Sequence, residues 1–89
     1  MKKSIAMQKA ADLAVECMKY IANFLTLGVT ELSLKRKIIK WFKDHGCKVS
    51  FDPIVAFGKN ASDPHHKPSK TKLTPKDVVV IDIGCVYHG

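Results

Sequence analysis

The spacing of apolar residues changes at Gly46, and this change limits the fold more than any other feature of the sequence. Before Gly46, two segments, 4–25 and 31–45, place apolar residues at helical intervals. After it, short apolar runs at 47–51, 53–58 and 78–87 predict strands. The stretch 59–77 is polar, contains three prolines and predicts a loop. Two N-terminal helices followed by antiparallel strands indicate an α+β fold.

Single residues mark the ends of these elements. Gly28 suits a turn after the first helix, because glycine adopts positive φ without strain. Thr30 is a favourable N-cap for the second helix, and Glu31 in its first turn interacts well with the helix dipole. Gly46 follows that helix as a stop signal. Gly84 predicts a break or bend in the last strand.

The composition favours one small globular domain. The chain has 89 residues, of which 46% are apolar and 26% charged. Its net charge of +7 comes mostly from lysines spread along the chain, with Arg36 as the single arginine. The densest basic group, 35–43, alternates with apolar residues as on the solvated face of an amphipathic helix. We therefore expect no nucleic-acid partner, and no apolar run is long enough to predict a membrane span.

The three cysteines predict a reducing environment. Cys17, Cys47 and Cys85 are an odd number and are not closely spaced. They are typical of buried or half-buried free thiols, which favours the cytoplasm. Their spacing, together with that of the histidines, lacks the pairs that zinc sites use.

Asp82 is the residue with the clearest chemical meaning, because it lies within the apolar run "VVVIDIG". If both faces of this strand are covered, an ionised carboxylate there needs a hydrogen-bonded, charged or cationic partner. Alternatively, Asp82 lies at the strand end and faces solvent or caps the turn at Gly84. His65 and His66 are neighbours in the loop, so they should point in opposite directions and not serve one metal. A plain exposed loop is the alternative for both.

The segment "SFDPIVAFGKNASDPHHKPSKTKLTPKDVVVIDIGCVYHG" resembles the early part of the catalytic domain of the M24 metallopeptidases. Within that family it is most similar to the Xaa-Pro aminopeptidase and prolidase branch. The matching pieces are "FDPIVAFGKNA", "PHH" and "LTPKDVVVIDIG". The preceding "LTLGVTELSLKRKIIKWFKDHG" also resembles the turn and second helix of the family.

The resemblance implies a pita-bread fold, in which two similar halves surround a curved antiparallel sheet. It implies a centre of two divalent metal ions, held by two Asp, one His and two Glu, that activates water and polarises the scissile carbonyl. Asp82 would be the first of these ligands, and His65 the histidine that contacts the bound peptide. His66 matches no direct role. Manganese is the preferred ion, with cobalt, zinc or iron as alternatives, and the substrate would be a peptide with proline in second position.

The same resemblance implies that residues 1–89 are a partial catalytic domain. The second aspartate of the family follows shortly after "IDIG", and the chain ends at Gly89 before it. We therefore expect the isolated chain to bind no metal stably and to be inactive. We also expect an unpaired apolar sheet edge, and hence marginal stability or self-association. The alternative is a non-catalytic binding module derived from the pita-bread fold.

Overall fold

The computed structural model describes residues 3–87 and confirms the predicted order of elements. These are α1 Lys3–Ala22, α2 Glu31–Asp44, β1 Cys47–Val49, β2 Ile54–Phe57, the 3-10 helix η1 Gly58–Ser62, β3 Val79–Asp82 and β4 Cys85–Tyr87. The predicted ends of the helices are right to within three residues. Within the described residues, no helix has the length and apolar character needed to cross a membrane.

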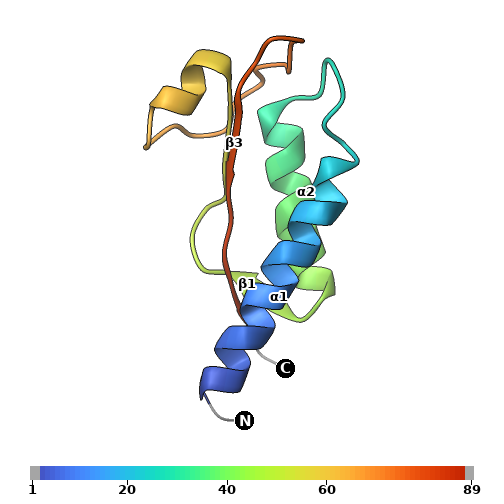
Figure 1. Cartoon of the computed structure of the whole chain (residues 1–89), viewed down its shortest axis with the longest axis vertical. Coiled ribbons are helices and arrows are strands. Elements are labelled where there is room, and N and C mark those ends of the chain that lie inside the picture. Colours follow the sequence, from blue (N-terminus) through green and yellow to red (C-terminus); the bar gives the residue numbers. More distant parts are fainter. Residues whose placement is uncertain (1–2, 88–89) are drawn as a thin grey trace.

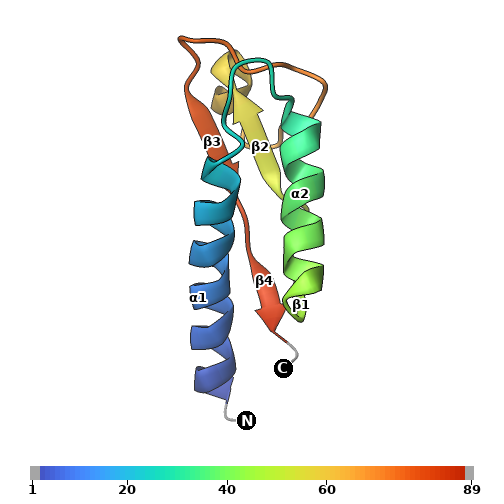
Figure 2. The same cartoon turned by 90° about the vertical axis from the view of Figure 1, so that its right-hand side faces the viewer.

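The strands form two antiparallel pairs along one long ribbon (Figure 2). In the first pair β2 lies against β3, with Ile54 opposite Asp82; in the second β1 lies against β4, with Cys47 opposite Tyr87. The run 78–87 divides into β3 and β4 around Gly84, where the sequence predicted a break or bend. A Cβ atom at Gly84 would lie 2.9 Å from the Phe51 ring and from the Ser50 hydroxyl, so a side chain there would require these neighbours to move.

Both helices cover the same face of this ribbon, while η1 and the first part of the loop after it project from the other (Figure 1). The core lies between helices and strands and contains Cys17, Ile21, Leu34, Ile38, Phe42, Cys47, Val55 and Phe57. Along β3, Val79 and Ile81 pack against this core, whereas Val80 and Asp82 are exposed. The expectation that both faces of this strand are covered is therefore wrong for the described chain.

The turn signals in the sequence are confirmed. Thr30 is the N-cap of α2, and its hydroxyl accepts a hydrogen bond from the Ser33 N–H at 3.1 Å. Gly28 and Gly46 have φ of +88° and +75°, which a residue with a side chain adopts only with strain. The residues next to α2 in the sequence thus determine where this helix begins and ends.

The polar stretch 59–77 is more ordered than the predicted loop. Its first residues belong to η1, a short helix that the composition of the stretch did not predict. Further along, the Leu73 N–H donates to the Val29 carbonyl at 2.8 Å, and the Glu31 N–H donates to the Thr71 carbonyl at 3.1 Å. These bonds attach the stretch to the N-terminal end of α2.

Candidate functional site

Asp82 is the last residue of β3 and points away from the helices. It lies opposite Ile54 in the register of the sheet, and its side chain is exposed. It lines a hollow of about 480 Å³ on the open face of the ribbon, which we call the aspartate hollow. The other lining residues are Ile54, Ala56, Ala61, Ser62, Asp63, Pro64 and Val80. In this chain the solvent-facing alternative therefore describes Asp82.

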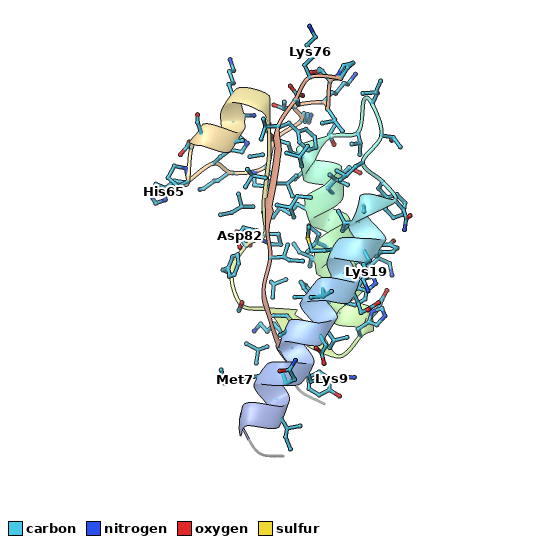
Figure 3. The ribbon with its side chains drawn as sticks, in the orientation of Figure 1. Met7, Lys9, Lys19, His65, Lys76 and Asp82 are labelled. Atoms are coloured by element: carbon cyan, nitrogen blue, oxygen red, sulfur yellow. The ribbon has the colours of Figure 1, made fainter. Side chains whose placement is uncertain are left out.

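His65 lies beside the aspartate hollow, in the segment 63–71, which we call the histidine loop. Its side chain is exposed and lines a second hollow of about 450 Å³, the histidine hollow. The two hollows share Ile54 and Pro64 as walls, so they adjoin each other. Figure 3 shows His65 and Asp82 on the same side of the ribbon, away from α1 and α2. The fold thus places the two residues that the sequence singled out in adjoining hollows.

A tight turn fixes the backbone of His65. The Asp63 carboxylate accepts a hydrogen bond from the His65 N–H at 2.9 Å, and the Asp63 carbonyl accepts one from the His66 N–H at 3.1 Å. Beyond this turn the two imidazoles separate: His65 lies at the surface, and His66 reaches inward to Glu31. This geometry is consistent with the prediction that the two histidines point in different directions.

The strongest polar cluster next to the histidine loop is centred on Glu31, whose side chain is fully buried. Its Oε1 lies 2.8 Å from His66 Nε2 and accepts hydrogen bonds from the Ser69 N–H at 3.0 Å and the Ser69 hydroxyl at 2.9 Å. Its Oε2 accepts from the Phe57 N–H at 2.7 Å and the Asn60 amide at 3.1 Å. One carboxylate thus joins α2, the end of β2, η1 and the histidine loop.

These hydrogen bonds determine the charge of Glu31. Burial alone would raise the pKa of its carboxyl, but bonds from His66, Phe57, Asn60 and Ser69 outweigh burial and lower the pKa from 4.5 to about 2. Glu31 is therefore an anion at neutral pH and can only accept hydrogen bonds. His66 Nε2 must then carry the hydrogen in this contact.

The sequence analysis did not find this role of Glu31. An acid in the first turn of a helix is common, and its interaction with the helix dipole is a sufficient explanation at that stage. Its hydrogen-bond partners are 26 to 38 residues away along the chain. Nothing local in the sequence indicates that they meet, so only the fold could identify the cluster.

The metal-binding capacity of the described residues is small. Among residues 3–87, no group of three or more His, Cys, Asp or Glu side chains lies in position to hold a metal ion. Asp82 shares its hollow with one other carboxylate, that of Asp63. These residues alone do not fit a two-metal centre, which needs several ligands that converge on each ion.

Comparison with known proteins identifies the family. The model of metallopeptidase family M24 matches residues 5–89, which is nearly the whole chain. The chain belongs to metallopeptidase family M24. A relative from Mycoplasma pneumoniae that carries the name Xaa-Pro aminopeptidase is 40% identical over 90 residues, which cover 96% of this chain and 24% of the relative.

Solved structures of a dipeptidase and a prolidase also share the fold. The Xaa-Pro dipeptidase from Bacillus anthracis has a TM-score of 0.90 and 28% identity, and covers 97% of this chain and 25% of that one. The prolidase from Thermococcus sibiricus has a TM-score of 0.89 and 34% identity, and the match covers 96% of this chain and 24% of the prolidase. The resemblance and the pita-bread fold class predicted from the sequence are confirmed. The chain spans about a quarter of the length of these relatives.

Proposed function

We propose that this chain is the N-terminal part of the catalytic domain of a Xaa-Pro peptidase. In that domain it would help to release the N-terminal residue from peptides with proline in second position. The observation that carries the proposal is the placement of Asp82 and His65 in adjoining hollows on the open face of the ribbon. Both residues lie within the segment that the M24 model matches.

The two residues would have different roles. The exposed carboxylate of Asp82 is a suitable oxygen ligand for a divalent cation, and manganese is the ion we favour. The metal centre of a complete domain would supply the activated water. His65 has an exposed imidazole in the adjoining hollow and would exchange a hydrogen bond with the peptide near its scissile bond.

The test uses the 89-residue chain and a polypeptide that carries it at the start of a complete M24 domain. Both are treated with chelator, reloaded with Mn²⁺ and given a Xaa-Pro peptide or a matched Xaa-Ala peptide. The complete domain should cleave the Xaa-Pro peptide, and Asp82→Asn should abolish cleavage. The 89-residue chain should release nothing. Cleavage by the short chain, or equal cleavage of both peptides by the complete domain, would contradict the proposal.

A second candidate is a non-catalytic binding module. Among residues 3–87 no group of three or more His, Cys, Asp or Glu side chains lies in position to hold a metal, which agrees with this candidate and equally with a partial catalytic domain. In this case the longer polypeptide would bind the Xaa-Pro peptide without cleaving it, with or without Mn²⁺. Calorimetric titration beside the cleavage assay separates the two candidates.

We also propose that the chain associates with itself through the edge of β3 that pairs with no other strand in residues 3–87. Val78 and Val80 are 66% and 38% exposed beside this strand edge. Light scattering over a concentration series should show mass increasing with concentration; a monomer throughout would contradict this.

The cytoplasm remains our proposed location, on the basis of three free cysteines.

A further inference from the structure

The geometry points to Glu31 as a positioning residue for His65. We infer that its buried carboxylate holds the histidine loop in one place, so that His65 stays in the wall of the histidine hollow, next to the aspartate hollow. The inference rests on the proposed function, which gives His65 a reason to be held there. It concerns a residue outside the hollows that would act through His66 and Ser69.

The carboxylate holds the histidine loop at two points. His66 Nε2 and the backbone and hydroxyl of Ser69 all meet Oε1. On the other side, Oε2 is bound by the Phe57 N–H at the end of β2. Because Phe57 belongs to the sheet that also carries Asp82, Glu31 connects the histidine loop to the frame of the aspartate hollow.

The hydroxyls near the carboxylate form an ordered chain around it. Since Glu31 only accepts, the Ser69 hydroxyl donates to Oε1, and the Thr71 hydroxyl, 2.8 Å from Ser69 Oγ, donates to that oxygen in turn. Asn60 completes the chain by donating to both Glu31 Oε2 and Thr71 Oγ1. In the described residues, no buried side-chain nitrogen or oxygen lacks a partner. The network is therefore complete, which favours a single arrangement of the loop.

Stability alone does not explain a buried acid at this position. Replacing buried ionic groups by well-packed apolar ones is often neutral or stabilising, because desolvation of the charge costs free energy. An apolar residue could not, however, fix the direction of five donors from three segments. A carboxylate with two acceptor oxygens specifies where each segment lies, and the loop beside it carries the proposed peptide-binding histidine.

His65 itself lies between two fixed neighbours. On one side, the Asp63 carboxylate binds its N–H; on the other, His66 is bound to Glu31. Its imidazole remains exposed, so the backbone is held while the side chain stays available. This is the arrangement expected when a loop must present one side chain accurately.

The test measures the order of the histidine loop in the 89-residue chain by NMR relaxation and amide exchange. His66→Ala removes the ring that binds Glu31, and His66→Gln restores a donor close to the place of Nε2. Glu31→Gln removes the charge. Glu16→Gln is the matched control, because Glu16 is an exposed glutamate on α1. Neither peptide nor metal is present, so the result does not depend on whether the proposed activity is found.

In the wild type and in Glu16→Gln, the backbone order parameter of His65 should be near the rigid value of about 0.85. In His66→Ala it should fall below about 0.6 while the circular dichroism of the helices is retained, and His66→Gln should recover most of it. Exchange protection of the Ser69 amide should fall roughly ten- to a hundredfold in His66→Ala, as expected for loss of a charge-assisted bond.

A role confined to stability would give a different result. The variants would then unfold at lower denaturant concentration, but the folded population would keep a rigid His65 and a protected Ser69. That outcome in His66→Ala overturns the inference, even if Glu31→Gln fails to fold. If Glu31→Gln folds and leaves His65 rigid, the carboxylate is not what positions it, and the inference is again overturned.

Discussion

Replacing Glu31 by glutamine should destabilise the chain at neutral pH and have almost no effect in acid. A lowered pKa in the folded state means that the carboxylate stabilises the fold at every pH above 4.5, the value given for the unconstrained group. This stabilisation is lost as pH falls from 4.5 through about 2. A shift from 4.5 to about 2 corresponds to about 3 kcal/mol.

The hydrogen bonds of Glu31 give a similar magnitude. Glutamine keeps one acceptor oxygen, so its amide nitrogen would face either the Phe57 N–H and Asn60 or the donors of His66 and Ser69. A buried donor left without an acceptor costs about 1–3 kcal/mol. With the amide nitrogen toward Phe57 and Asn60, two such donors would cost about 2–6 kcal/mol, a large share of the stability of a domain of this size.

The assay is urea unfolding followed by circular dichroism at pH 7, 4.5, 3 and 2.5, because urea adds no salt. The wild type should exceed Glu31→Gln by about 3 kcal/mol at pH 7, and the difference should shrink steadily below pH 4.5. Glu16→Gln, at an exposed site, should stay within about 0.5 kcal/mol of the wild type at pH 7. A Glu31→Gln difference below 0.5 kcal/mol at pH 7, or one that is the same at every pH, would refute the reasoning.

Three further predictions concern other sites. Gly84→Ala should lower the free energy of unfolding by about 1–3 kcal/mol, because its Cβ would lie 2.9 Å from the Phe51 ring; an unchanged urea midpoint would contradict this. The sulfurs of Cys47 and Cys85 are 3.3 Å apart, so excess peroxide should join them with loss of two hydrogens, which mass spectrometry of a proteolytic digest would detect. Burial, then the hydrogen bond to Cys47, raises the pKa of Cys85 to about 12, so oxidation should be slow at pH 7 and faster near pH 10; rapid oxidation at pH 7 would argue against this environment. Asp82→Asn should leave the unfolding free energy of the chain within about 0.5 kcal/mol, because the side chain is exposed; a larger loss would indicate a structural role.

Local signals were sufficient to predict most of the elements. The helices follow from apolar spacing, and Thr30 and Gly46 mark the limits of α2 because capping and positive φ are properties of a few adjacent residues. The position of the strands after the helices in the sequence also follows, because the spacing of apolar residues changes once, at Gly46. What periodicity could not predict is which strands pair. The run 78–87 divides at Gly84, and its two parts pair with β2 and β1, which come from earlier segments of the chain.

The candidate site was only partly predictable for the same reason. Asp82 was identified because it is an acid in an apolar run, and both Asp82 and His65 were identified from similarity to a family. These signals lie in short contiguous stretches of the sequence, so they do not depend on knowing the fold. The prediction that both faces of β3 are covered was wrong. It was made because "VVVIDIG" is almost uniformly apolar. Its side chains nevertheless alternate between the core and the open face. Glu31 was given a lesser role because its partners come from segments that only the fold brings together.

The two faces of the ribbon separate stability from chemistry. The helix side contains the apolar core, including Ile38 and Phe42, and substitutions there should change folding first. The open side carries Asp82 and His65, whose side chains contribute little to that core. Glu31 is where the two sides meet, since it is as buried as the core and binds the loop of the open face. The donors that its charge holds come from β2, η1 and the histidine loop, so we infer that the buried carboxylate keeps that loop in one position as well as stabilising the fold.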